Sequence, residues 1–329
     1  MLNKKFEVIK EIGRGAQGIV YLIKFNNKKY ALKISKVYDI ENNKHKNFLL
    51  NKSIEIRLFK YINNLSIEDQ KLFIKLYDYK IHNFESNYYY IHLIEYYDGI
   101  TLTDFYKKNI KILSKQNLSI FIQLLKAIYL LYNGGYIHND INFDNILIKR
   151  TKKKFFKFKN KNINYNNYEI KIIDYSMALN KNLNDNINDN MLFNEIFYSI
   201  YIIFFLSKIL KISKVKEYKK IKIITLKKII NHYRLFYNKI IKNFILIYPN
   251  SKKSLLNIEN IKKIDIIKDV ELHNILNIFI FAFYCYYPKE FNKYFNLKIP
   301  KVELDKNIIN NLFKCKNYNE IIDLFLNNV

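Results

Sequence analysis

The sequence is poor in the residues that interrupt or cross-link a chain. Its 329 residues include no tryptophan, three prolines, six glycines and two cysteines. Cys285 and Cys315 are too few for a disulfide framework, and neither lies in a metal-ligand pattern. We therefore predict two core thiols in a reducing compartment. With 50% hydrophobic residues, the chain can bury a sizeable globular core.

The sequence also lacks a hydrophobic run long enough to cross a bilayer. The longest apolar runs, 196–206 and 275–287, are shorter than the ~20 residues that a membrane helix needs. The first five residues show no signal-peptide pattern. We expect buried core helices at both runs, no transmembrane segment, and an intracellular protein that is cytoplasmic or nuclear, or in a virion if viral.

Acidic residues are scarce beside basic ones. The chain has 29 Asp and Glu against 56 Lys and Arg, a formal net charge of +27. Such an excess can indicate nucleic acid, an anionic membrane or an acidic protein as partner. Lys, Asn, Ile and Tyr are abundant throughout, which favours instead codon bias in an AT-rich genome, such as that of a large DNA virus, a parasite or another microbe.

The strongest motif is an oxygen-rich cluster at residues 138–145, HNDINFDN. It follows a predicted helix at 120–131 and precedes a short predicted strand at 146–148. A second predicted strand, 170–173, ends at Asp174. If these strands form a hairpin, the side chains of Asp140, Asn145 and Asp174 converge, and such oxygen ligands suit Mg²⁺. Any one of them alone would more often cap a helix or form a turn.

Upstream, G-x-G-x-x-G occupies residues 13–18. Because 19–23 is predicted to be a strand, the glycines form a hairpin rather than the strand-to-helix turn of a dinucleotide fold. Glycine lets the backbone approach phosphates closely. Lys33 lies in the next predicted strand, and Glu55, on an amphipathic helical segment, is its predicted ion-pair partner, with Glu41 as the alternative.

In this order, the motifs resemble those of the protein kinase superfamily. The resemblance implies an α+β fold of two lobes, with a single domain over residues 1–329, a β-rich N-lobe at 1–95 and a mainly helical C-lobe at 96–329. It implies binding of ATP and Mg²⁺, with Asp140 receiving the proton of the acceptor hydroxyl. Ile94 takes the gatekeeper position, and backbone groups of the hinge at 95–99 bind adenine.

The resemblance assigns site residues position by position. The catalytic residues are Lys33, Glu55, Asp140 and Asn145; the nucleotide-binding residues are Ile12, Gly13, Gly15, Gly18, Val20, Lys33, Glu95 and Tyr97; the metal ligands are Asn145 and Asp174.

Several positions depart from the common kinase pattern. Asn139 replaces an arginine that binds a phosphorylated activation loop, and Asn142 replaces a lysine that steadies the transferring phosphate. The triplet 174–176 is D-Y-S rather than D-F-G, and no A-P-E motif follows. The D-Y-S triplet, the missing A-P-E motif and an insert at about 150–168 are together similar to haspin-like kinases, whereas the H-N-D tripeptide resembles choline and aminoglycoside kinases. We expect a serine/threonine protein kinase, with a small-molecule kinase or a partner-binding pseudokinase as alternatives.

An insert at about 150–168 carries a basic run interleaved with aromatic residues, 152–159. It is predicted to be either a solvated loop or a surface for single-stranded nucleic acid or an anionic membrane. Beyond residue 191 the pattern predicts helices alone, at 193–210, 215–230, 232–248, 261–287 and, in pieces, 302–326.

Overall fold

The structure is a computed structural model. It describes residues 2–183, with gaps at 3, 16–17, 38–42, 85–86 and 109–111, scattered positions from 192 to 204, and most of 281–293 and 304–328. Glu41, the predicted helices at 215–230 and 232–248, and most of those at 193–210 and 261–287 lie outside the described residues.

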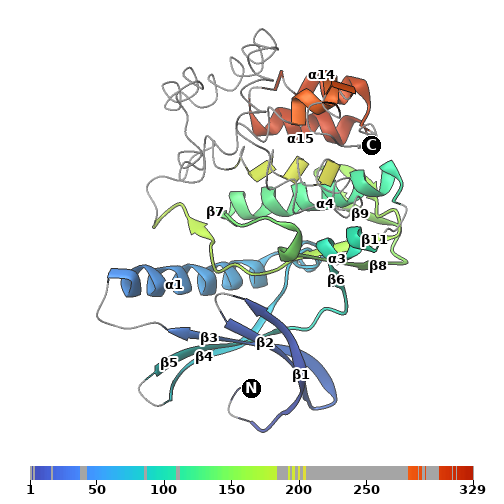
Figure 1. The fold of residues 1–329 in the computed structure, drawn as a ribbon. Helices are drawn as coiled ribbons and strands as arrows, with labels where there is room; N and C mark the ends of the chain where they lie inside the picture. The colour runs from blue at the N-terminus through green and yellow to red at the C-terminus, as the bar shows by residue number, and fades with distance from the viewer. Residues whose placement is uncertain are drawn as a thin grey trace.

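The N-terminal half opens with a five-stranded antiparallel sheet in the order β1-β2-β3-β5-β4 (Figure 1). Alternating apolar residues favour each strand, and Asn26 and Asn27, at φ +48° and +57°, form the tight turn between the second and third. The strands are β1 (Glu7–Gly15), β2 (Gly18–Phe25), β3 (Lys28–Val37), β4 (Leu76–Phe84) and β5 (Asn87–Glu95).

One long helix, α1 (Asn43–Asn64), lies between this sheet and the C-terminal half (Figure 1). Its buried residues Ile54, Leu58 and Ile62 recur every fourth position and so share one face of the helix. A second, smaller core of the N-lobe contains Leu2, Ile23, Leu32 and Leu93. The short helix α2 (Ile67–Gln70) follows, capped by Ser66.

The C-terminal half is built around α4 (Ser114–Asn133). The predicted hairpin is present, since β8 (Ile146–Arg150) and β11 (Tyr168–Ile172) pair antiparallel, with β6 (Ile100–Thr101) beside β8. The smaller elements are α3 (Leu102–Lys107), β7 (Tyr136–Ile137), the 3-10 helix η1 (Phe143–Asn145), β12 (Leu179–Asn180), α14 (Lys306–Leu312) and α15 (Tyr318–Asn327).

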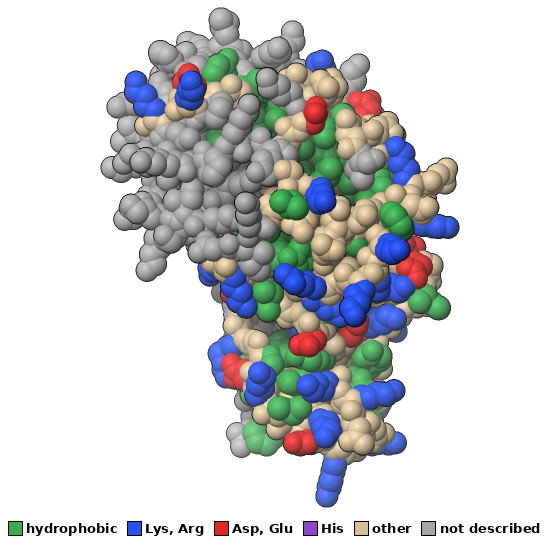
Figure 2. All heavy atoms as spheres, turned by 90° about the vertical axis from the view of Figure 1, so that its right-hand side faces the viewer, with side chains coloured by type: hydrophobic (Ala, Val, Ile, Leu, Met, Phe, Trp, Pro, Cys, Tyr) green, Lys and Arg blue, Asp and Glu red, His purple; other side chains and the backbone are tan. Residues whose placement is uncertain are grey.

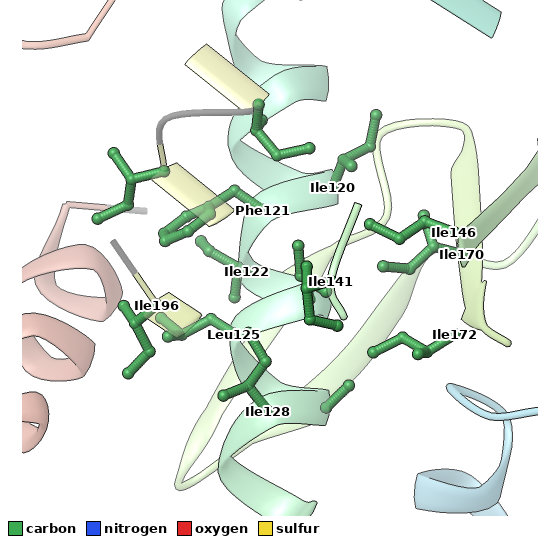
Figure 3. Close-up of a cluster of buried hydrophobic side chains, with 14 of the residues drawn as sticks. Ile120, Phe121, Ile122, Leu125, Ile128, Ile141, Ile146, Ile170, Ile172 and Ile196 are labelled. Atoms are coloured by element: carbon green, nitrogen blue, oxygen red, sulfur yellow. The ribbon is translucent and has the colours of Figure 1, made fainter. Parts of the chain in front are cut away.

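A buried aliphatic cluster supports the loop that carries Asp140 (Figure 3). Ile122 and Leu125 of α4 belong to the same buried core as Ile146 and Ile172 of the β8–β11 hairpin. Ile141, the neighbour of Asp140, is 3% exposed and belongs to this core. Burial of an isoleucine contributes about 1.5–3 kcal/mol, so the loop is anchored at the residue next to its carboxylate.

The two predicted core runs are partly described. Ile196, Ile200 and Ile203 are fully buried, as expected for a core helix, and so are Phe281 and Phe283. Of the helices in the described part of the chain, none combines the length and the apolar character needed to cross a membrane.

The basic insert is not a solvated loop, which corrects one of the two expectations for it. It forms an antiparallel hairpin of β9 (Phe155–Phe158) and β10 (Lys161–Asn164). Phe156 and Phe158 are buried because they alternate with exposed lysines and face the core. Of the three phenylalanines in the run, Phe155 alone is exposed.

Candidate active site

The β1–β2 hairpin brings the three glycines together. Gly15 pairs with Gly18 and Gly13 with Val20 across the hairpin. Gly18 has φ +152°, and a Cβ there would lie 2.2 Å from the carbonyl oxygen of Ile34. Only glycine fits this close approach of β2 to β3. Gly18 is therefore needed for the packing of the sheet, in addition to the close backbone approach to phosphate expected from the motif.

Lys33 joins two carboxylates that come from opposite halves of the chain. Its Nζ lies 3.3 Å from Oε1 of Glu55 on α1 and 2.7 Å from Oδ1 of Asp174, which follows β11. Glu55 also lies 3.9 Å from Nδ1 of His92, on β5. The expected Lys33–Glu55 contact is therefore present.

The two carboxylates around Lys33 keep it charged, and Lys33 in turn keeps Asp174 ionised. Burial lowers the pKa of Lys33, but the two carboxylates outweigh it and the pKa is raised above its ordinary value. Burial raises the pKa of Asp174, yet the charge and hydrogen bond of Lys33 lower it overall. Lys33 is therefore a cation and Asp174 is an ionised carboxylate.

The loop after β7 holds Asp140 with two amides. Nδ2 of Asn145 donates to Oδ2 of Asp140 at 2.8 Å and to its backbone carbonyl at 2.9 Å. Nδ2 of Asn142 donates to Oδ1 of Asp140 at 3.0 Å. Asn139, at φ +61°, adopts the left-handed conformation that asparagine tolerates best among residues with a Cβ. The structure therefore brings Asp140 and Asn145 into direct contact.

Two buried residues beneath this loop have structural contacts that sequence reasoning missed. His138 is fully buried, its Nε2 donates to the carbonyl of Ile173 at 3.0 Å, and burial lowers its pKa. Oε1 of Glu195 accepts from the backbone N–H of Asn139 at 2.7 Å, and burial raises the pKa of Glu195 to about 7. The one signal for Glu195 in the sequence is that it is the single carboxylate of the predicted helix at 193–210.

Tyr175 fills the pocket that the resemblance assigns to a phenylalanine. It is fully buried, and its ring meets Phe59 of α1 edge-on at 4.9 Å. Its hydroxyl donates to the carbonyl of Ile172 at 2.9 Å and accepts from the N–H of Ile74 at 3.2 Å. The tyrosine thus adds hydrogen bonds at the junction between the two halves that phenylalanine could not make.

Contacts with β11 hold the predicted hinge in place. Lys171, buried on β11, donates to Oε2 of Glu95 at 2.8 Å. The Tyr97 side chain is buried, with its hydroxyl donating to the carbonyl of Glu169 at 3.3 Å. The Tyr97 carbonyl accepts from the N–H of Gly99 at 2.8 Å. Among the nucleotide-binding residues expected here, Tyr97 therefore offers backbone groups rather than its ring.

The donor set fits Mg²⁺ held partly by a nucleotide. The amide nitrogen of Asn145 is occupied by Asp140, which leaves its amide oxygen as a ligand beside the ionised Asp174. Within the described residues, no group of three His, Cys, Asp or Glu side chains forms a complete metal site. Mg²⁺ characteristically takes one or two protein ligands and completes its shell with phosphate and water.

The N-terminal half is a five-stranded sheet that carries the glycine hairpin. The mainly helical C-terminal half carries Asp140, Asn145 and Asp174. Together they form the two-lobed architecture of a kinase. A family model described as "protein kinase domain" matches residues 6–198, more than half of the chain. The chain belongs to the protein kinase domain family, and the predicted α+β kinase fold is confirmed.

Relatives named as serine/threonine-protein kinases show similarity over part of their length. Serine/threonine-protein kinase CLA4 of Candida albicans is 29% identical over 153 residues, 44% of this chain and 14% of the relative. Putative serine/threonine-protein kinase L670 of Acanthamoeba polyphaga mimivirus is 32% identical over 159 residues, 46% and 25%. Serine/threonine-protein kinase 1 of Heliothis zea nuclear polyhedrosis virus is 36% identical over 87 residues, 26% and 31%. The match thus spans less than a third of each relative.

Proposed function

We propose that this chain transfers the γ-phosphoryl group of ATP to serine or threonine hydroxyls of a protein substrate. The observation that carries the proposal is the position of Lys33, whose Nζ contacts both Glu55 at 3.3 Å and Asp174 at 2.7 Å. Lys33 pairs with Val20 of the glycine hairpin across β2 and β3, and a lysine so placed between two carboxylates is suited to bind polyphosphate beside a metal ion.

Each residue has a role within this proposal. Lys33 binds the α- and β-phosphates, and Glu55 keeps its amino group in place. Asp140 accepts the proton of the acceptor hydroxyl, while Asn145 and Asp174 hold Mg²⁺. The metal, when bound, neutralises charge on the phosphates. The nucleotide lies between Val20 and the hinge, with Ile12 and the glycines above it and backbone groups of Glu95 and Tyr97 at the adenine.

We also propose that the domain continues past residue 198. Supporting this, Phe325 of α15 lies 4.5 Å from Phe121 of α4, between ring centroids, and both are fully buried. Since α15 completes the core around α4, it belongs to the same domain, and we place the domain's end beyond the described C-terminal helices α14 and α15.

The test is transfer from labelled ATP and Mg²⁺ to a protein mixture, and separately to choline and aminoglycosides. Wild type is compared with Asp140→Ala and Lys33→Met, with Lys126→Met as a matched control. Lys126 is also a buried, ion-paired lysine, 2.6 Å from Asp69, but it belongs to α4. We expect label on protein, phosphoserine or phosphothreonine after acid hydrolysis, and loss of label in the first two variants.

Three results would count against the proposal. Label on a small molecule alone would place the chain with choline-type and aminoglycoside-type kinases, to which its H-N-D tripeptide is similar. Equal labelling by wild type and Asp140→Ala would show that the label comes from a contaminant. Nucleotide binding without any transfer would leave a pseudokinase, for which retaining Lys33, Asp140, Asn145 and Asp174 together has no physical purpose.

A further inference from the structure

The carboxylate of Asp140 is held from both sides, by two amides of different origin. Oδ2 accepts from Asn145 at 2.8 Å, and Oδ1 accepts from Asn142 at 3.0 Å. Asn145 already has a place in the proposed function as a metal ligand. Asn142 has none, and the kinase resemblance places a lysine rather than an amide at this position.

The orientation of the Asn142 amide is determined by its other contacts. Its Oδ1 accepts from the backbone N–H of Asp144 at 2.9 Å and from that of Asn145 at 3.1 Å, which makes Asn142 the N-cap of η1. Because two N–H groups face this atom, it must be the oxygen. The ambiguity between amide oxygen and nitrogen is removed, and the atom facing Asp140 is the donor.

We propose that Asn142 is a positioning residue for phosphoryl transfer, orienting the Asp140 carboxylate through its amide N–H; this rests on the proposed function. A free aspartate carboxylate rotates over a broad range of χ2. A separate donor on each oxygen restricts that rotation, while each oxygen keeps a second lone-pair direction. The carboxylate is then aimed before the acceptor hydroxyl arrives.

The same side chain connects Asp140 to the turn that carries Asn145. Its oxygen holds the N-terminus of η1 and its nitrogen holds the carboxylate of Asp140. Proton acceptor and predicted metal ligand are therefore kept in one rigid group. The alternative is that Asn142 serves only as a cap, and a variant must separate these two roles.

Asn142→Ser makes that separation. Serine caps a helix about as well as asparagine, but it lacks the amide N–H that reaches Asp140. Asn142→Thr provides a second variant that keeps a capping hydroxyl and lacks the amide N–H. Because hydrogen bonds to charged groups are among the stronger ones, we expect kcat to fall about tenfold or more in both, with KM for ATP unchanged.

The matched control is Asn317→Ser. Asn317 is also an N-cap, accepting from the N–H of Glu320 at 3.0 Å, but it caps α15. The kcat of the Asn317→Ser variant should equal that of wild type. Thermal unfolding of all variants checks that the cap at η1 survives in Asn142→Ser.

The decisive measurement is a double-mutant cycle with Asp140→Asn. If Asn142 acts through the carboxylate, Asn142→Ser should lower kcat in the wild-type background and leave the residual rate of Asp140→Asn unchanged. Wild-type kcat in Asn142→Ser, or an equal loss in both backgrounds, would overturn the inference while leaving the proposed function intact. A wild-type chain that transfers no phosphate would overturn both.

Discussion

Nζ of Lys33 lies 2.7 Å from Oδ1 of Asp174, closer than to Oε1 of Glu55 at 3.3 Å. This contact joins a strand of the N-lobe to a loop of the C-lobe, 141 residues further along the chain. One buried cation therefore faces two carboxylates, which leaves one negative charge for a metal to neutralise. The pair sets the spacing of the lobes at the place where a nucleotide would bind.

Asp174→Asn should abolish the metal dependence of this site. The amide still accepts a hydrogen bond from Lys33 but no longer supplies the charge that Mg²⁺ requires. We expect phosphoryl transfer to fall by about 100-fold or more, as for loss of an electrostatic group in other active sites. A Mg²⁺ titration at fixed ATP measures it, with Asp323→Asn, an exposed carboxylate on α15, as control. An unchanged Mg²⁺ optimum would contradict the assignment of Asp174.

The buried Glu195 predicts a stability that depends on pH. Its pKa is about 7 in the fold against an ordinary value of 4.5, so the folded state binds its proton more tightly than the unfolded state. Stability from this group is full below pH 4.5 and is lost as the pH rises towards 7. The shift corresponds to a loss on the order of 3 kcal/mol.

Glu195→Gln should remove that dependence, because the amide keeps an acceptor for the N–H of Asn139 without titrating. Urea unfolding at pH 5 and pH 8 should show a smaller difference for the variant than for wild type. The same substitution at Glu320, in the first turn of α15, is the control and should leave the difference unchanged. A variant whose stability falls as steeply as that of wild type would show that another group titrates.

Much of this arrangement followed from the sequence because local patterns carried it. Alternating residues and glycines predict β1 and β2, and helical spacing predicts α4. The hairpin β8–β11 followed from two short apolar strands, and its register then brings Asp174 near Asp140 and Asn145. These features depend on neighbours within a few residues, or on strands whose pairing is nearly forced.

The features that the sequence did not predict depend on which face of a strand or loop is buried by elements distant in the sequence. The aromatic residues of the insert looked available for stacking, but the hairpin β9–β10 turns Phe156 and Phe158 into the core. The sequence predicted backbone groups of the hinge at the adenine, but it gave no sign that the Tyr97 side chain would be buried with its hydroxyl bonded to Glu169. Glu195 lies 56 positions from Asn139, and no local pattern joins them.

Tyr175→Phe should destabilise the fold without impairing transfer. The substitution keeps the buried ring against Phe59 and removes a hydroxyl that bonds two backbone groups. The N–H of Ile74 keeps a bond to the carbonyl of Ile172 at 3.2 Å, so neither backbone group is orphaned. We therefore expect a loss of about 1 kcal/mol in the free energy of unfolding.

Tyr106→Phe is the matched comparison for that measurement. Tyr106 of α3 is also fully buried and its ring packs against Phe143 of η1, but its hydroxyl donates to Oδ1 of Asn117 on α4 at 3.1 Å rather than to the D-Y-S loop. Both variants should lose similar stability in urea titrations and keep wild-type kcat. A large fall in kcat for Tyr175→Phe alone would show that the hydroxyl holds the D-Y-S loop in its working state.

The chain should bind single-stranded nucleic acid through its overall positive charge rather than through a dedicated surface on the basic insert. Residues 150–168 contain no acidic residue and seven cations, and Lys149 of β8 directly precedes them. Lys149 and Lys153 pair with Glu169, and Lys159 pairs with Asp323, so part of this charge holds the hairpin to the fold. Figure 2 shows Lys and Arg spread over both lobes on this side of the molecule rather than gathered in one groove.

Two sets of four Lys or Arg→Gln substitutions separate a dedicated surface from overall charge. The insert set changes four exposed cations that form no ion pair within the described residues, Arg150, Lys152, Lys154 and Lys157. The N-lobe set changes four exposed lysines of β1 to β3, Lys10, Lys24, Lys28 and Lys29. Since two of the three phenylalanines are buried, we expect equal losses of affinity for labelled oligothymidylate, and none for Phe155→Ala. Anisotropy titrations at several salt concentrations measure this. A larger loss in the insert set together with a loss in Phe155→Ala would establish the hairpin as a specific binding surface, because stacking and charge would then act at one place.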